Sequence, residues 1–393
     1  MKNVILFLFI VLSSIAKGQQ YPISNECRVS LLTCTPGDEL YSCFGHSAIR
    51  IQDKKYDVDL VFNYGTFDFN KPNFYVNFLK GILIYSLGVD DFESFKSNYI
   101  YEERGIAEQV LRLDSMQKLR LVNFLMHNAT PENRDYRYDF LLDNCATRII
   151  DALDTATHGQ ITYHTANWDT TITFRNLIDE YSYDKRWENF GMNLLIGYPV
   201  DKPTSPREQQ FLPDYLAKAI ASATISADGK NIPLVLSKKT LLSRPQVPKV
   251  FSFFTPEYVF VTLLLLSLVL TIIDFKTKIR FRLFDAMLFF SVGILGLIMF
   301  NLWFFTQHWT TAINLNILWA MPTHLLLAIL VWKKTNTTWL RWLVIYSLIS
   351  TVGFLLFHTI LPQHFQIGMV YISTSVSLRL GMWYYRLSSY YKP

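Results

Sequence analysis

Residues 136–148 read Tyr-Arg-Tyr-Asp-Phe-Leu-Leu-Asp-Asn-Cys-Ala-Thr-Arg, and they place Cys145 where a helix is predicted to begin. Asp143 and Asn144 are residue types that cap helix N-termini. The apolar residues that follow repeat at the spacing of a buried helical face, at Ala146, Ile149, Ile150 and Leu153. A thiol in a first helical turn lies near unpaired N–H groups and the positive end of the helix dipole, which favour the thiolate. Arg148 adds positive charge one turn on. The pattern predicts a nucleophile; an inert buried cysteine is the alternative.

A histidine about a hundred residues upstream supplies the base that such a nucleophile requires. His46 lies in a predicted strand, Cys43–Ile51, which forms a hairpin with a second predicted strand, Tyr56–Tyr64. The expected turn puts His46 opposite a residue near Phe62, and the polar side chain at that level is Asn63. The imidazole would take the thiol proton, and an amide on the neighbouring strand would orient the ring. A structural histidine is the alternative.

The third member of this set depends on the register of the hairpin. A shift by one residue would replace Asn63 by Phe62 or Tyr64. Asp59 and Asp68 are then alternative partners for the histidine.

Charge is distributed unevenly along the chain. Half of the 393 residues are hydrophobic and 18% are charged, and charges become scarce beyond about Lys249. The formal net charge of +5 does not indicate nucleic-acid binding, because the later basic residues lie in short clusters between apolar runs. Residues 1–19 have the basic start, apolar core and small residues of a secretory signal peptide, with an uncleaved anchor as the alternative.

We therefore predict four parts. They are a signal peptide at residues 1–19, an exported domain at 20–242, a proline-containing linker at 243–256 and a transmembrane domain at 257–393.

The transmembrane domain is predicted from apolar runs of about the length that crosses a bilayer. The five runs are Tyr258–Ile273, Leu283–Phe305, Ile313–Trp332, Leu340–Ile360 and Ile367–Leu387. Lys and Arg collect in alternate loops, which places the N-terminal domain outside and the C-terminus in the cytoplasm. Asp285 and Arg379 lie near predicted helix ends, where snorkelling would suffice.

Three observations concern the remaining candidate sites. In an exported domain, two of Cys27, Cys34 and Cys43 are expected to pair, leaving Cys145 reduced. His158 and His164 do not have a convincing metal-ligand spacing, so no metal is expected. Aromatic residues gather at Phe67, Phe69, Phe74, Tyr75 and Phe78, either as ordinary core or as an apolar cleft that admits acyl chains.

Four blocks of the exported half carry a family resemblance. They are Leu31–Glu39, Gly45–Arg50, Asn63–Phe69, and Tyr136–Asp139 with Asp143–Arg148. Together they resemble the Lnb-type N-terminal periplasmic domain, which is joined to a multi-spanning membrane region in lipoprotein N-acyltransferases of some diderm bacteria. The order of His before Cys is also similar to circularly permuted papain-like folds, including the lecithin:retinol acyltransferase and NlpC/P60 relatives.

The resemblance implies an α+β exported domain of circularly permuted papain-like fold, followed by an all-α bundle of five transmembrane helices in the bacterial inner membrane. It implies His46 as base, Cys145 as nucleophile and a polar strand residue such as Asn63 as third member. Substrate contacts are expected from Asn144, Arg148, Tyr138, Asp139 and Tyr64.

The implied reaction moves an acyl chain from a phospholipid, through a cysteine thioester, to the α-amine of a diacylglyceryl-cysteine lipoprotein, without cofactor or metal. One alternative is a membrane-anchored cysteine hydrolase, either a peptidase or a lipase. A second is a non-enzymatic scaffold or sensor in which Cys145 is structural.

Overall fold

The computed structural model describes residues 23–68, 72–227, 229–244, 253–333 and 336–389. The chain divides into two compact units. The first comprises Met1–Phe69, Leu83–Trp168 and Pro206–Gln246, and the second comprises Asn70–Ile82, Asp169–Ser205 and Val247–Pro393. Two segments within the predicted exported domain are thus grouped with the C-terminal helices. The signal peptide and most of the linker lie outside the described residues, so those boundaries stay predictions.

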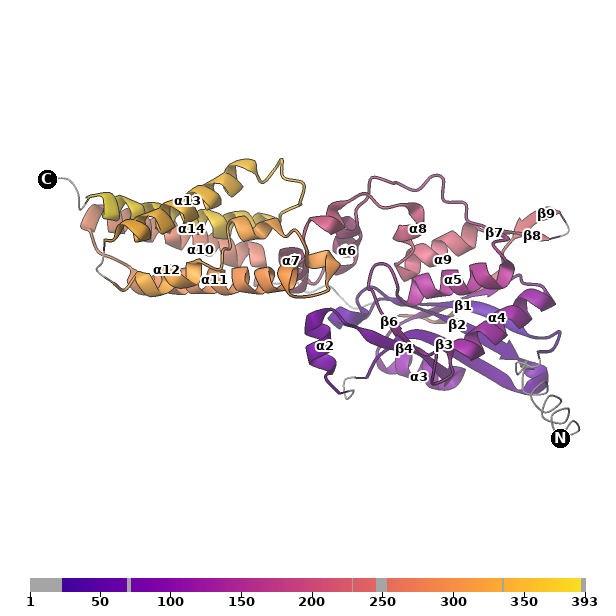
Figure 1. Cartoon of the computed structure of the whole chain (residues 1–393). Helices are drawn as coiled ribbons and strands as arrows, with labels where there is room; N and C mark the ends of the chain where they lie inside the picture. The colour runs from indigo at the N-terminus through magenta and orange to yellow at the C-terminus, as the bar shows by residue number, and fades with distance from the viewer. Residues whose placement is uncertain (1–22, 69–71, 228, 245–252, 334–335, 390–393) are drawn as a thin grey trace, which may run out of the picture. The chain divides into compact units, whose positions relative to one another are not determined.

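The first unit is built on a seven-stranded antiparallel sheet (Figure 1). Its order is β10 (Val235–Leu242), β5 (Ile106–Leu111), β1 (Arg28–Cys34), β2 (His46–Asp53), β3 (Val58–Thr66), β4 (Ile84–Asp91) and β6 (Asp135–Arg137). Strand β1 is buried along almost its whole length because it pairs with β2 and β5 and has covered faces. Its buried residues include Ser30 and Thr33 as well as apolar side chains.

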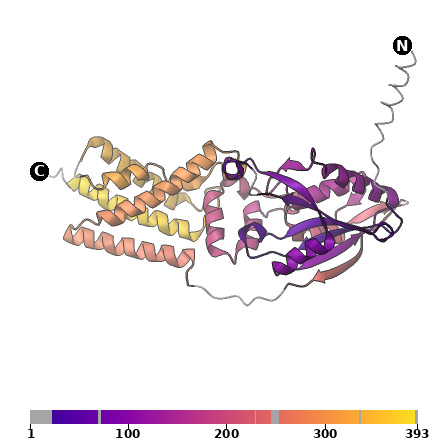
Figure 2. The ribbon, with the colours of Figure 1, turned by 90° about the horizontal axis from the view of Figure 1, so that it is seen from below.

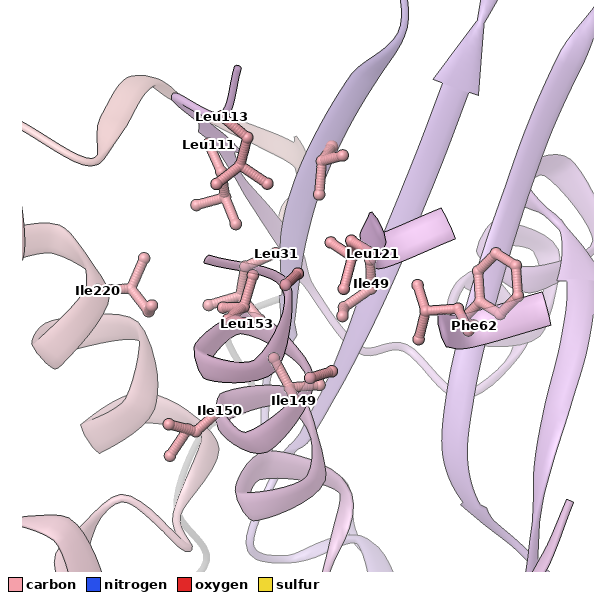
Figure 3. Packing of buried hydrophobic residues seen from close by; sticks show 14 of the residues in the cluster. Leu31, Ile49, Phe62, Leu111, Leu113, Leu121, Ile149, Ile150, Leu153 and Ile220 are labelled. Carbon is pink, nitrogen blue, oxygen red and sulfur yellow. The ribbon is translucent and has the colours of Figure 1, made fainter. Parts of the chain in front are cut away.

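Helices cover both faces of this sheet. One face packs against α4 (Ser115–Asn128), α5 (Cys145–Thr157) and α9 (Pro213–Ser222), and the other against α3 (Phe92–Tyr101). Figure 3 shows Ile149 and Leu153 of α5 beside Leu31 and Ile49 of the sheet. The neighbours Leu32, Ala48 and Val61 belong to the opposite core, because successive strand residues alternate between faces.

Short elements complete the first unit. They are η1 (Leu40–Ser42), η2 (Lys54–Tyr56), α8 (Pro206–Gln209) and a small antiparallel sheet of β7 (Ile161–Thr162), β8 (Thr224–Ala227) and β9 (Lys230–Pro233). The α+β character predicted for the exported half is confirmed.

The second unit contains long helices that run side by side in both views (Figures 1 and 2). They are α10 (Pro256–Thr277), α11 (Arg282–Phe304), α13 (Thr338–Phe357) and α14 (Ile367–Ser389). Among the described residues, α10, α11 and α13 are long and apolar enough to cross a membrane by length and composition. Helix α14 has a comparable length but carries Arg379 and Arg386.

The third apolar run does not form one continuous helix. It consists of η5 (Leu315–Leu318), an irregular turn containing Pro322, and the short α12 (His324–Leu330). A Cβ on Gly296 of α11 would lie 2.1 Å from the carbonyl oxygen of Ala320, so the backbones meet directly at this turn. The indole of Trp319 donates to Asn316, which satisfies polar groups beside the break.

Shorter elements belong to the same unit, namely α2 (Phe74–Lys80), α6 (Phe174–Ser182), α7 (Arg186–Leu195), η3 (Tyr198–Asp201) and η4 (Trp309–Thr311). The sequence of residues 191–201 suggests a turn into a strand, but this segment is the end of α7 followed by η3. Phe190 and Leu194 are buried one helical turn apart, which identifies the helical face.

The sequence predicts that Asp285 and Arg379 snorkel to a surface. This prediction is wrong, because both side chains are buried and paired. Arg379 is 1% exposed; its guanidinium lies 2.6 Å from Asp285 and 3.1 Å from Asp274. Arg386 also pairs with Asp274. Burying a charge is costly unless it is paired, so these contacts tie α10, α11 and α14 together.

The expected disulfide among the first three cysteines is also wrong, because none of the four described cysteines is joined to another. Cys27 precedes β1 and Cys34 ends it, which separates them by roughly 20 Å along the strand. Cys43 lies close in sequence to His46, which pairs with Cys34 at the same end of the strand. Cys27 therefore cannot reach either partner.

Candidate active site

Cys145 is the first residue of α5, as predicted. Asn144 is the N-cap, and its side-chain oxygen accepts hydrogen bonds from the backbone N–H groups of Ala146 and Thr147. The Thr147 hydroxyl accepts in turn from the Asn144 N–H, which completes a capping box. The predicted apolar face is fully buried at Ala146, Ile149, Ile150 and Leu153. Burial of that face against the sheet fixes the direction in which the thiol leaves the helix.

The imidazole of His46 and the thiol of Cys145 lie close enough to interact, and this interaction shifts the pKa of both groups. His46 is the first residue of β2, and α5 packs against β2 and β3. The histidine and the cysteine are 99 positions apart in the sequence and meet because helix and sheet share one core.

Asn63 of β3 completes the cluster. Its side-chain oxygen lies 2.5 Å from Nε2 of His46 and accepts a hydrogen bond from it. Because Nε2 is occupied by this bond, Nδ1 is the ring nitrogen left for the sulfur. The amide thus fixes both the tautomer and the ring orientation.

The register behind this contact differs from the expected one. Phe62 pairs with Ile49, and the hairpin connection occupies residues 54–57 rather than a turn centred on Asp53 and Lys54. His46 is therefore level with residue 65, and Asn63 reaches it diagonally across the strands. The alternative partner Asp59 instead binds Arg50 at 2.6 Å.

The electrostatics of the pair favour charge separation. Burial alone would raise the pKa of the Cys145 thiol, but the charge and hydrogen bond of His46 and the backbone N–H groups of Ser47 and Ala146 lower it below its usual value. Burial alone would lower the pKa of His46, but the Cys145 charge and its hydrogen bonds to Cys145 and Asn63 raise it. Both shifts favour a thiolate beside an imidazolium over the neutral pair.

Arg148 and Asp143 form an ion pair on the first turn of α5. The Arg148 guanidinium also lies over the ring of Tyr136, 4.1 Å from its centroid. The positive charge that the sequence places near Cys145 is therefore balanced by Asp143. Arg148 remains partly exposed, so a substrate anion can still approach it.

Of the other predicted contact residues, Tyr138 lies beside the site, whereas Asp139 and Tyr64 support the surrounding structure. Tyr138 stacks on Tyr85 with ring centroids 4.2 Å apart, and its ring lies 3.7 Å from where a Cβ on Gly65 would be. Asp139 accepts from the N–H groups of Leu141 and Leu142, and so holds the loop before α5. Tyr64 is buried in the main core.

Tyr136 was not singled out as a site residue, although it opens the decisive stretch. Its hydroxyl is buried and has no hydrogen-bond partner among the described residues. That oxygen lies 4.0 Å, and the Cys145 Cβ 3.9 Å, from the same point beside Gly65. Burial raises the pKa of this phenol, so it stays a proton donor. Only the three-dimensional neighbourhood, not the sequence spacing, identifies this residue.

These observations define a class: an α+β domain with a Cys-His-Asn cluster, joined to a helical membrane region. The described residues hold no group of three or more His, Cys, Asp and Glu side chains that could bind a metal. Two family models match the chain. The Lnb N-terminal periplasmic domain covers residues 19–180, and the Lnb transmembrane domain, a five-helix domain, covers residues 248–390.

Together the two models cover most of the chain, which belongs to the Lnb family. Its N-terminal domain is periplasmic and its C-terminal region is transmembrane. No curated protein and no solved structure matches it.

Proposed function

We propose that this chain is a lipoprotein N-acyltransferase of the bacterial inner membrane, the activity that the Lnb resemblance implies. The observation that carries the proposal is the cluster of Cys145, His46 and Asn63, in which Asn63 orients the imidazole that interacts with the thiol, in a periplasmic domain attached to membrane helices. A thiolate held this way suits acyl transfer through a thioester.

In the first step, the Cys145 thiolate attacks an ester carbonyl of a phospholipid. A C–S bond forms, the ester C–O bond breaks, and the leaving alkoxide takes the proton from His46 to give a lysophospholipid. The product on the enzyme is a thioester, with His46 now neutral.

In the second step, the α-amine of a diacylglyceryl-cysteine lipoprotein attacks the thioester carbonyl. A C–N bond forms, the C–S bond breaks, and His46 takes the proton that the amine loses. This restores the thiolate–imidazolium pair. His46 is neutral after the first step and can therefore accept the proton of the amine. Asn63 keeps the imidazole ring oriented in both steps.

Both steps pass through a tetrahedral oxyanion beside Cys145. Donors available there include the N–H of Cys145 at the helix start and the hydroxyl of Tyr136. The helix dipole adds a favourable potential. Tyr138, Asp139 and Arg148 are candidates to contact the headgroup or amine, and Asn144 supports the donors through its cap.

A membrane-anchored cysteine hydrolase is the second candidate, because the same thiolate would form the same acyl-enzyme if water replaced the amine. A non-enzymatic scaffold is favoured less, since a structural cysteine does not require an oriented base. The membrane region is a natural requirement when both donor and acceptor are lipid-anchored.

Mass spectrometry of lipoprotein N-termini tests the proposal in cells that depend on this chain. We expect N-acylated termini with the wild-type protein, and their loss with Cys145→Ala and with His46→Ala. Cys27→Ala is the matched control, because this cysteine is also buried but precedes β1, away from the end of the strand that pairs with His46. Free fatty acid without N-acylated product would favour the hydrolase, and unchanged acylation in both variants would reject the proposal.

A further inference from the structure

Helix α2 exposes apolar side chains that a water-soluble surface would normally bury. Leu79 is 65% exposed and Tyr75 is 67% exposed, and Val76 and Phe78 are exposed as well. None of the residues of this helix is buried. Of the two alternatives for the aromatic residues, ordinary core is therefore wrong for Tyr75 and Phe78, while Phe69 lies outside the described residues. A contiguous exposed apolar surface of this kind marks a binding surface.

The C-terminal end of α2 is anchored to the segment that follows α11. The Gln307 N–H donates to the carbonyl of Lys80 at 2.8 Å, and His308 Nε2 bonds the carbonyl of Phe78 at 2.9 Å. A Cβ on Gly81 would lie 2.7 Å from the His308 nitrogen, so the two backbones touch. These contacts lie within one compact unit.

That anchorage sets the level of α2 relative to the bilayer. Lys276 at the end of α10 and Lys278 and Arg280 in the loop before α11 make this connection cytoplasmic by the positive-inside rule, so α11 ends at the periplasmic boundary. Phe304 and Phe305 are exposed at that end, as expected for lipid-facing aromatics. Helix α2 bonds to residues only two to three positions beyond Phe305.

Chain connectivity ties the same helix to the candidate active site. Strand β3, which carries Asn63, ends at Thr66, eight residues before Phe74. After α2, Leu83 follows Lys80 by three residues, a span of about 10 Å at most. The Leu83 carbonyl accepts the backbone N–H of Tyr138, which neighbours Cys145.

We propose that α2 inserts its apolar side chains into the outer leaflet of the membrane and contacts the acyl chains of its phospholipids. The occupant is lipid rather than protein because the surface is continuous with a lipid-facing helix end. Phe and Tyr at an interface, with Lys80 as the basic residue, suit this position. This deepens the proposed function, because α2 would contact the phospholipids that supply the acyl chain, and the chain leads directly from α2 into the unit that carries Cys145.

Photocrosslinking in vesicles of phosphatidylethanolamine and phosphatidylglycerol tests the contact directly. A benzoylphenylalanine at Val76 or Leu79 of the full-length Cys145→Ala protein should give phospholipid adducts in mass spectra. The same probe at Leu356 on α13, 70% exposed, is the positive control, and at Tyr101 on α3, 90% exposed, the negative control. Adducts at Leu356 but not at α2, or α2 adducts only to a protein, would overturn the proposal. Using the Cys145→Ala chain separates lipid contact from catalysis.

A second experiment tests the link to the reaction. Val76→Ser with Leu79→Ser should lower acyl transfer from vesicle phospholipid by about tenfold or more, since each apolar side chain removed from lipid weakens insertion on that order. The rate at which a small soluble reagent alkylates Cys145 should stay at the wild-type value, which shows an intact site. Unchanged transfer would contradict donor delivery by α2. If the variant fails to fold, the crosslinking result decides alone.

Discussion

Cys145 and Cys34 are both buried cysteines, yet their surroundings differ in charge. Burial raises the pKa of Cys34 to about 12, with only partial compensation from its hydrogen bond to Tyr99 and the charge of Arg104. Cys145 has His46 and two backbone N–H groups, which lower its pKa despite burial. The neighbouring charges and N–H groups, rather than the extent of burial, therefore distinguish the nucleophile from a structural thiol.

This difference predicts selective alkylation. Iodoacetamide should modify Cys145 at neutral pH and leave Cys34 and Cys27 unmodified in the folded chain. Because His46 lowers the Cys145 pKa and Cys145 raises the His46 pKa, the two groups extend the pH range in which a thiolate lies beside an imidazolium. Alkylation should fall as pH drops through the lowered Cys145 pKa.

His46→Ala should move that midpoint upward and slow alkylation at pH 7 by roughly 10²-fold, the usual contribution of a positioned base. The measurement is the pH profile of Cys145 modification by peptide mass spectrometry. An identical profile in wild-type and His46→Ala proteins would show that the histidine does not ionise the thiol.

Tyr136→Phe tests the hydroxyl as an oxyanion donor. Removing one such donor should lower kcat by about 10²-fold with little change in KM, because the bond strengthens only in the transition state. The alkylation rate of Cys145 should not change, since that reaction forms no oxyanion. An equal loss in both measurements would indicate a structural role instead.

At the scale of single residues, the sequence was sufficient to place Cys145 at the start of a helix and His46 in a strand, because each stands beside local signals of that element. It was insufficient for Tyr136, whose unpaired hydroxyl becomes visible only when β6 and α5 are placed together. The roles of Arg148 and Asp139 also depend on partners, Asp143 and two backbone N–H groups, that spacing alone does not specify.

The start of α5 shows how an element holds a reactive group. The Asn144 amide donates to the carbonyls of Phe140 and Phe211 while its oxygen caps the helix. One side chain therefore links the preceding loop, the helix and a segment 67 residues away.

Asn144→Ala should destabilise α5 by about 2–3 kcal/mol, since it removes a cap worth about 1 kcal/mol and leaves two carbonyls without their donor. Asp114→Ala, which removes the equivalent cap of α4, is the matched control and should cost about 1 kcal/mol. Hydrogen exchange of the helix amides measures both. Equal losses would mean that the two extra bonds of Asn144 contribute nothing.

At the scale of elements, helices with strong apolar periodicity were predictable, including α4 and α5. The sequence of α4 suggests Ser115 as its cap, but the structure has Asp114 in that position, one residue earlier. The β2–β3 register could not be derived because the connection is a 3₁₀ turn ending in left-handed Asp57, not a two-residue turn. The break in the third apolar run could not be predicted, because the hydropathy of a segment carries no information on backbone contacts with other segments, such as the contact at Gly296.

The whole molecule combines two units with different cores. The sequence predicted their polar and apolar character from charge distribution and alternating basic loops. It did not predict that residues 70–82 and 169–205 group with the membrane helices, because those contacts are between segments far apart in the chain. Asn314, for example, donates to the carbonyls of Leu194 and Leu195.

The buried charges of the membrane unit give a prediction for its stability. Arg379→Met would leave Asp285 without its partner and should cost about 3–5 kcal/mol, seen as a lower thermal midpoint in detergent. Combining Arg379→Met with Asp285→Leu should recover much of the lost stability, because no unpaired charge is then left at this pair. A double variant no more stable than the single one would contradict this account.

The central claim is that an acyl chain rests on Cys145 during the reaction. Purified wild-type protein mixed with phospholipid, without acceptor, should show one acyl mass on the Cys145 peptide, removable by hydroxylamine. His46→Ala should accumulate it far more slowly, and adding a diacylated lipopeptide should discharge the wild-type adduct to an N-acylated product. Transfer that proceeds with no adduct on Cys145, or with an adduct on another residue, would contradict the account.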